Sequence, residues 1–216
     1  MHLRVCLLAV LAAAVFAASA QATSRPIRPG DESLLKRGAT YEEQVAEYVA
    51  ARLTRLRPEV RCGPLGIAAP PGLFIGGITL IPSNGPATYF LVEPSNCGYL
   101  TAFRQDPGRF DPTLCTDGAC MQDAARAAFA LATVSHESYH VLGYRNEAQV
   151  ECYGMQSIWF VAKSLGATVL EGQRIAANYW KTTYAQRRTT TPTYWTAQCR
   201  NGGKYDLRPK SDSWPS

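Results

Sequence analysis

Apolar residues recur at helical spacing in several long stretches of the chain, and these stretches predict its helices. The first begins at Thr40, where Thr40-Tyr41-Glu42-Glu43 has the form of a capping box, and Pro58 ends it. The second contains no glycine or proline, and Gly143 ends it. The third begins after Asn146, a residue that commonly caps helices. The predicted helices cover residues 40–58, 121–142, 146–164 and 168–187.

Between the first two helices the pattern changes to short runs rich in β-forming residues, separated by proline and glycine. These runs, at residues 73–81, 87–93 and 99–104, predict a small antiparallel sheet. Helices and sheet in separate blocks indicate an α+β fold. The short link 143–145 predicts that the helix after it folds back antiparallel on the helix before it. We expect a single domain over residues 39–200, followed by a C-terminal tail over 201–216.

The N-terminus has the pattern of a secretory signal peptide. Residues 1–22 combine an early Arg4, an apolar run from residue 5 to 18 and small residues at the end. The run is shorter than the roughly 20 residues that a membrane-spanning helix needs, so we expect cleavage and no stable membrane insertion afterwards. Residues 23–38 are expected to be a flexible leader. The predicted location is secreted, either periplasmic or extracellular.

Cleavage after residue 22 would leave six of the seven cysteines, an even number that is typical of disulfide bonds in an exported protein. Cys115 and Cys120 enclose an Asp-Gly turn signal and form the pair that the sequence favours most. For the other four we expect Cys62 with Cys97 and Cys152 with Cys199, although six cysteines allow many connectivities.

Composition narrows the function. The chain has 216 residues, of which 46% are hydrophobic and 18% charged, and its net charge is +5. Because the basic residues are scattered, we expect no nucleic-acid partner. There are three histidines, and loss of His2 with the signal peptide would leave His136 and His140.

Both of these histidines lie in the segment His136-Glu137-Ser138-Tyr139-His140, which has the H-E-x-x-H pattern. On a helix, residues four apart lie on one face, so both imidazoles can bind one tetrahedral Zn²⁺ ion. Glu137 would then face the zinc-bound water and act as its general base. One zinc ion is therefore the expected cofactor.

A catalytic zinc site needs a third protein ligand, and no histidine remains for it. The next acidic residues are Glu147 and Glu151, which lie one turn apart on one face of the following helix. Folding that helix back would bring either carboxylate to the histidines. Tyr144, in the turn, could donate a hydrogen bond to the oxyanion of a tetrahedral intermediate.

With this second segment, Asn146-Glu147-Ala148-Gln149-Val150-Glu151, the chain resembles the gluzincin metallopeptidases, which pair H-E-x-x-H with a downstream N-E-x-x-x-D. The resemblance implies a zincin-like core, with Glu147 as third ligand and Glu151 orienting His136. It covers about residues 133–156, with Glu151 in place of the final Asp and a shorter link than in thermolysin. Glu151 therefore stays an alternative ligand.

The segment from His136 to Asn146 also resembles the metzincin pattern H-E-x-x-H-x-x-G-x-x-H, with Asn146 in the last place. Asparagine is a poorer zinc ligand than histidine or a carboxylate, so this resemblance ranks second. The sequence thus predicts a secreted zinc metallopeptidase that acts on peptides or proteins. The alternative is a non-catalytic, disulfide-stabilised binding protein on the same scaffold.

Overall fold

The computed structural model of the chain describes residues 40–66, 75–82 and 87–215. The expected signal peptide (1–22), the expected leader (23–38) and the start of the predicted run 73–81 lie outside the described residues.

Helix α1 (Tyr41–Thr54) begins where the capping box predicts. The hydroxyl of Thr40 accepts a hydrogen bond from the Glu43 amide, and the Glu43 carboxylate accepts one from the Thr40 amide. The helix ends at Thr54, earlier than the expected Pro58, because Arg55 takes a left-handed conformation with φ of 59°. The chain then extends into strand β1 (Glu59–Cys62), which the sequence did not predict.

The sheet has the strand order β1-β3-β2, with β2 at Gly77–Thr79 and β3 at Tyr89–Val92. Strand β3 pairs antiparallel with β2 but parallel with β1. The expectation of an antiparallel sheet was therefore wrong, because the unpredicted β1 takes a place beside β3 and makes the sheet mixed. Strands β2 and β3 do lie within the predicted runs 73–81 and 87–93.

The predicted run 99–104 is not a strand but part of helix α2 (Pro94–Gln105). Glu93 caps this helix by accepting a hydrogen bond from the Ser95 amide, and Pro94 occupies its first turn. Its buried residues recur at helical spacing: Asn96, Cys97, Leu100, Phe103 and Arg104. A helix start signal therefore outweighed the β-forming residues that follow it.

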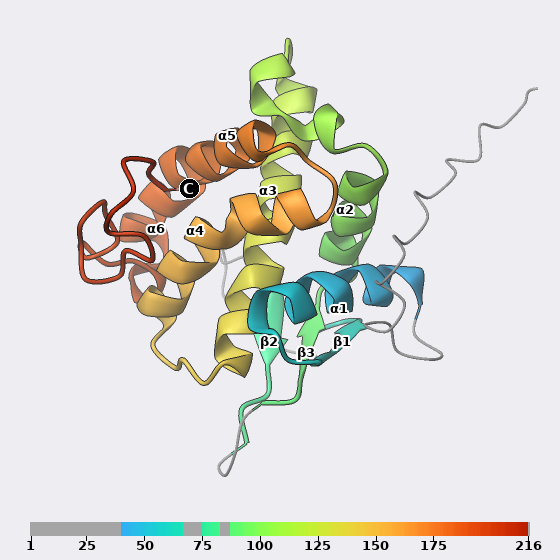
Figure 1. Cartoon of the computed structure of the whole chain (residues 1–216). Coiled ribbons are helices and arrows are strands. Elements are labelled where there is room, and N and C mark those ends of the chain that lie inside the picture. Colours follow the sequence, from blue (N-terminus) through green and yellow to red (C-terminus); the bar gives the residue numbers. More distant parts are fainter. Residues whose placement is uncertain (1–39, 67–74, 83–86, 216) are drawn as a thin grey trace, which may run out of the picture.

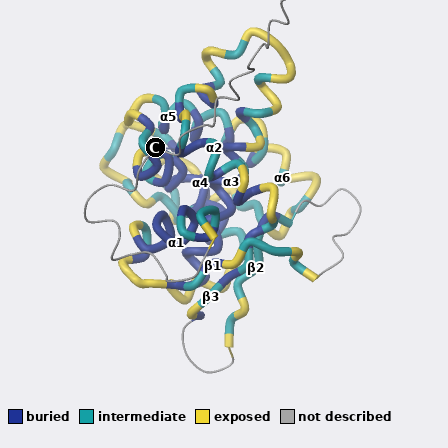
Figure 2. The backbone as a smooth tube through the Cα atoms, turned by 90° about the vertical axis from the view of Figure 1, so that its right-hand side faces the viewer, coloured by how far each residue is buried: buried dark blue, intermediate teal, exposed yellow. Residues whose placement is uncertain are grey.

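Helix α3 (Gly118–Val141) runs through the centre of the molecule and contacts α1, α2, α4 (Glu147–Ser164) and α5 (Val169–Tyr179) (Figure 1). The short 3-10 helices Pro107–Phe110 and Pro112–Leu114 lead into it. Helix α4 turns back against α3 and crosses it obliquely in this view. Buried backbone is concentrated where these helices meet (Figure 2).

The predicted helix 168–187 is interrupted. After α5 come a π-helical segment, η4 (Trp180–Tyr184), helix α6 (Ala185–Thr190) and a short 3-10 helix, η5 (Pro192–Tyr194). The η5 segment packs against α4 and brings the ring of Tyr194 to within 5.7 Å of the ring of His136 in α3. The last residues also contact α4, since the side-chain amide nitrogen of Gln156 donates to the Tyr205 carbonyl at 2.7 Å.

Three disulfides join the pairs expected from the sequence: Cys62–Cys97, Cys115–Cys120 and Cys152–Cys199. The first ties β1 to α2, and the last ties α4 to the C-terminal region. Such bonds are typical of extracytoplasmic proteins. No helix in the described part of the chain is long and apolar enough to cross a membrane.

Candidate metal centre

The C-terminal half of α3 carries the H-E-x-x-H segment into the interior. His136, Glu137 and His140 are 7%, 5% and 6% exposed. Helix α4 approaches this segment closely at Gly154, where an added Cβ atom would lie 3.0 Å from the backbone nitrogen of His136. The close approach brings the first turns of α4 to the histidines.

The turn between α3 and α4 sets which residues of α4 reach the site. Gly143 adopts a φ of 93°, a conformation that side chains other than glycine rarely take. Asn146 then caps α4 by accepting a hydrogen bond from the Gln149 amide at 2.9 Å. Glu147 is therefore the first residue of the helix, and Glu151 follows one turn later.

His136, His140 and Glu147 form a compact group of potential ligands. The Nε2 atom of His136 lies 3.1 Å from Nε2 of His140 and 3.1 Å from Oε2 of Glu147. The third side of this triangle, from His140 Nε2 to Glu147 Oε2, is 3.5 Å. Ligand atoms at about 2.0–2.1 Å from a tetrahedral zinc ion stand about 3.3–3.4 Å apart, because a tetrahedron's edge is about 1.63 times its centre-to-vertex distance. The triangle therefore fits three ligands of one such ion.

The partners of the ring nitrogens bear on the tautomers of both histidines. His140 Nδ1 lies 2.8 Å from the Tyr144 carbonyl oxygen, which can only accept a hydrogen bond, so Nδ1 is the protonated nitrogen. Both ring nitrogens of His136 face a carboxylate, Nδ1 that of Glu151 at 3.0 Å and Nε2 that of Glu147 at 3.1 Å. When the proton of the neutral ring lies on Nδ1, this nitrogen donates to Glu151 and Nε2 is left free to bind a cation. With both histidines in this tautomer, the Nε2 lone pairs face each other and the Glu147 carboxylate. Such a cluster of electron pairs suits a bound cation.

The pKa values of His136 and Glu147 also indicate that a positive charge is stabilised at this site. Burial opposes a charge on His136, but hydrogen bonds with Glu147 and Glu151 outweigh it and raise its pKa to about 10. Burial likewise opposes ionisation of Glu147, yet the two histidines lower its pKa to about 2. Without a metal, a proton on His136 supplies the positive charge. The donor set and its electrostatics thus suit a divalent cation bound by His136, His140 and Glu147.

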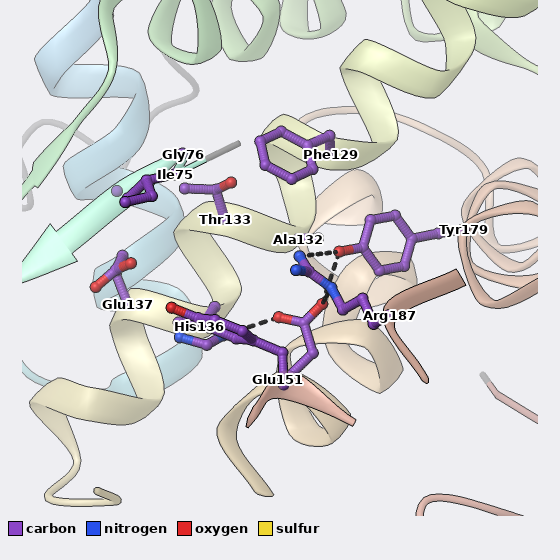
Figure 3. Close-up of a pocket in the computed structure, with 12 residues that line it drawn as sticks. Ile75, Gly76, Phe129, Ala132, Thr133, His136, Glu137, Glu151, Tyr179 and Arg187 are labelled. Atoms are coloured by element: carbon purple, nitrogen blue, oxygen red, sulfur yellow. Dashed lines mark hydrogen bonds and ion pairs between the residues drawn. The ribbon is translucent and has the colours of Figure 1, made fainter. Parts of the chain in front are cut away.

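Glu137 lies beside this group on the sheet side of a cavity of about 40 Å³ (Figure 3). The Thr79 hydroxyl of β2 donates to Oε2 of Glu137 at 2.6 Å. The backbone of β2 can come this close because Gly77 has no side chain: an added Cβ would lie 2.8 Å from Cγ of Glu137. Burial raises the pKa of Glu137, which makes its carboxylate a stronger proton acceptor.

Glu151 stands behind His136 rather than among the potential ligands. Figure 3 shows it between His136 on one side and Tyr179 and Arg187 on the other. Its Oε1 atom accepts from the Tyr179 hydroxyl at 2.8 Å and lies 2.6 Å from Nε of Arg187. Burial opposes its ionisation, but the charge of Arg187 holds its pKa below the ordinary value. Glu151 therefore lies between a potential metal ligand, His136, and the buried pair of Tyr179 and Arg187.

The tyrosines near the site divide into two groups. The ring of Tyr144 contacts Tyr139 and Tyr153, at centroid distances of 5.8 Å and 5.3 Å, in a cluster beside the turn. The ring of Tyr194, in η5, instead lies 5.7 Å from the ring of His136. Burial, and then the negative charge of Glu147, raises the pKa of Tyr194 to about 12, so its phenol keeps its proton at neutral pH.

Four residues at the site were not identified as site residues from the sequence: Thr79, Tyr179, Arg187 and Tyr194. They come from β2, α5, α6 and η5, and no local spacing relates them to the H-E-x-x-H segment. Comparison with known proteins adds no family, since no protein-family model, curated protein or solved structure matches the chain.

Proposed function

We propose that the protein is an exported zinc metallopeptidase that hydrolyses peptide bonds. The observation that carries the proposal is the triangle of His136 Nε2, His140 Nε2 and Glu147 Oε2, with the carboxylate of Glu137 beside it. A zinc ion held there supplies a Lewis acid that polarises a carbonyl and lowers the pKa of a water to about 7.

The residues of the chain divide the remaining work. Glu137 accepts the proton of the attacking water and delivers it to the leaving amine, and Thr79 holds its carboxylate in place. Glu151 fixes the tautomer of His136, so that its Nε2 stays free to bind the metal. A tyrosine hydroxyl donates to the oxyanion. Tyr194 is better placed for this than Tyr144, because its ring lies against His136.

The sheet supports a polypeptide as the substrate. Strand β2 is at the sheet's edge in the described part of the chain and runs directly beside Glu137. An extended peptide can add to such an edge by backbone hydrogen bonds. The three disulfides support action in an oxidising, extracytoplasmic compartment. Nucleic acid is not proposed as a partner, since the basic residues form no run.

Metal analysis and a peptide-cleavage assay test the proposal together. We expect one zinc per purified chain, loss of zinc in His136→Ala, and retained zinc with loss of peptide hydrolysis in Glu137→Gln. Absence of bound zinc, or full retention of zinc in His136→Ala, contradicts the site. Equal hydrolysis by the wild type and Glu137→Gln contradicts the role of Glu137.

A second function, a non-catalytic binding protein with a structural metal, follows from the same ligand triangle. It predicts that the wild type and Glu137→Gln both bind zinc and that neither hydrolyses peptides. The third ligand is tested in the same assay: we expect Glu147→Gln to weaken zinc binding more than Glu151→Gln, because only Glu147 Oε2 lies within 3.5 Å of both histidine Nε2 atoms.

A further inference from the structure

A groove of about 840 Å³ lies next to the metal centre, between α2 and α3 on one side and the η4–α6 segment on the other. Helix α3 contributes Gln122, Arg126 and Phe129, and the opposite side contributes Thr183, Gln186 and Thr190. We call it the long groove. None of these side chains has a part in the zinc chemistry proposed above.

The long groove opens directly from the metal centre. Ile75, Phe129 and Arg187 line both the groove and the 40 Å³ cavity that contains His136 and Glu137. The floor of the groove is also the same face of α3 that carries His136, because Gln122, Arg126, Phe129 and Thr133 precede it at intervals of three or four residues. A polymer lying across the metal centre can therefore continue along the groove without changing direction.

The length of this floor sets how much of a polymer it can hold. From Gln122 to His136, α3 advances about 21 Å at about 1.5 Å per residue. An extended polypeptide rises about 3.4 Å per residue, so the same distance accommodates about six residues. Such a length is expected of an enzyme that cuts within a chain rather than at its end.

The chemistry of the lining changes along the groove. Next to the metal centre it is formed by the apolar Ile75 and Phe129 and by Arg187, whose charge is paired with Glu151. Farther out most lining residues are uncharged and polar, among them Gln122, Thr183 and Gln186, and their methyl and methylene groups add apolar surface to their hydroxyl and amide groups. These groups can hydrogen-bond to peptide N–H and C=O groups and to uncharged polar side chains.

The charged groups of the lining already have partners inside the protein. Glu93 caps α2, and Arg187 pairs with Glu151. Arg126 donates to the Tyr99 hydroxyl at 3.4 Å. With Arg187 neutralised by Glu151, the remaining charges of the lining, Glu93 and Arg126, are of opposite sign, so the groove has no net charge to select a charged substrate.

We propose that the long groove binds about six residues of an extended polypeptide on one side of the scissile bond, with an apolar residue nearest the metal and uncharged polar residues beyond it. This inference rests on the proposed function and names the substrate class of that site. It makes the enzyme an endopeptidase that acts on uncharged polar segments. A polypeptide is favoured over a glycan because the groove continues from β2, the edge that offers backbone pairing.

Peptide binding to zinc-loaded Glu137→Gln tests the groove without requiring turnover. Labelled peptides carry flanks of two, four, six or eight uncharged polar residues on either side of a fixed apolar pair. We expect affinity to rise about tenfold or more as one flank grows from two to six residues, and then to level off. Lengthening the other flank should have a smaller effect.

Two adjacent threonines provide a matched pair of variants. Thr189 and Thr190 are both exposed, and each hydroxyl donates to the Gln186 carbonyl at 3.1 Å, but Thr190 lines the groove and Thr189 is not part of its lining. We expect Thr190→Trp to lower the affinity for the six-residue flank about tenfold and to leave the two-residue flank unaffected. Thr189→Trp should change neither.

A change of charge gives a test that a folding defect cannot mimic. Gln122 is exposed at the far end of the floor. Gln122→Glu should favour a peptide with lysine at the outermost flank position over one with glutamate, and Gln122→Lys should reverse the preference. Three results would overturn the proposal. The first is a peptide affinity that does not depend on flank length, and the second is an equal effect of the two tryptophan variants. The third is Thr190-dependent binding of soluble glycan fragments without binding of peptides. Failure of the proposed function is distinct, since the wild type would then cleave none of the peptides, whatever they bind.

Discussion

Replacing Arg187 by methionine tests whether the positive charge behind the metal centre is needed for stability and for zinc binding. We expect Arg187→Met to destabilise the protein and to weaken zinc binding. Methionine keeps an apolar stem but removes the guanidinium group. The side chains of Arg187 and Glu151 are 11% and 5% exposed, and the pair is 2.6 Å apart. The substitution therefore removes the closest cation from a buried carboxylate and leaves it only His136 as a partner that can carry a positive charge.

The magnitude has an upper limit, because Glu151 can take up a proton instead of staying charged. With an ordinary glutamate pKa of 4.5 in the unfolded chain, protonation at pH 7 costs about 3.4 kcal/mol at about 1.36 kcal/mol per pKa unit. At pH 5 the same protonation costs only about 0.7 kcal/mol. Loss of Arg187 raises the folded pKa of Glu151, so the destabilisation must grow as pH rises above the unfolded pKa. We expect up to about 3 kcal/mol at pH 7 and less than about 1 kcal/mol at pH 5.

Arg188 is the matched control for this substitution. Both guanidinium groups lie over an aromatic ring, at 5.1 Å from Tyr194 for Arg187 and 5.3 Å from Trp195 for Arg188. Arg188 is exposed and has no ion pair within the part of the chain that the structure describes. Arg188→Met should therefore unfold like the wild type in urea at both pH values.

Zinc competition titrations provide the second measurement. An ionised Glu151 accepts from Nδ1 of His136 more strongly than a protonated one does, so its protonation weakens the hydrogen bond that orients a metal ligand. We expect Arg187→Met to lower zinc affinity by about 10–100-fold. Equal stability of the two methionine variants at pH 7, or a difference that grows toward pH 5, would refute this reasoning.

Four further predictions concern packing, crosslinks, pH and the oxyanion. Gly154→Ala should destabilise the protein by about 1–3 kcal/mol, because its methyl group would lie 3.0 Å from the His136 nitrogen; a wild-type urea midpoint would contradict this. Replacing Cys152 and Cys199 by serine opens a crosslink between residues 47 apart and should lower the unfolding free energy by about 4 kcal/mol in urea titrations. The His136 pKa of about 10 lies above its ordinary 6.5, so the stability that its proton gives the metal-free protein is complete below pH 6.5 and is lost as pH rises through 10. Since zinc must displace that proton, zinc affinity should rise about tenfold per pH unit between about pH 7 and 9, and a pH-independent affinity in competition titrations would contradict it. Tyr194→Phe should lower kcat about a hundredfold with unchanged zinc content. Equal steady-state rates of the wild type and this variant would exclude the Tyr194 hydroxyl as the donor to the oxyanion.

The ligand triangle could be predicted because local geometry determines it. His136 and His140 are one helical turn apart. Glu147 follows a short link that begins at Gly143 and ends at the helix cap Asn146. Helical periodicity and a short link leave few ways to arrange these three side chains. The sequence also placed Glu151 near the site, but geometry was needed to separate its position from that of Glu147.

The surrounding residues could not be predicted, because tertiary packing places them. Thr79 lies 58 positions before Glu137, and Tyr179 and Arg187 lie 28 and 36 positions beyond Glu151. No periodicity connects such distant residues. The wrong strand at 99–104 has a different cause: a short run of apolar and aromatic residues fits either period, and the start signal at Glu93 and Pro94 decides for a helix.

The charges at the centre make a divalent ion, rather than a proton, the complement of the site. Glu137, Glu147 and Glu151 contribute three negative charges when ionised, and Arg187 offsets one of them through its contact with Glu151. Two negative charges remain around two neutral imidazoles. A proton on His136 would offset half of that charge, whereas Zn²⁺ offsets all of it. Arg187 therefore sets the charge balance of the metal centre from outside the set of ligands, which is why its loss should weaken zinc binding although it contacts no ligand atom.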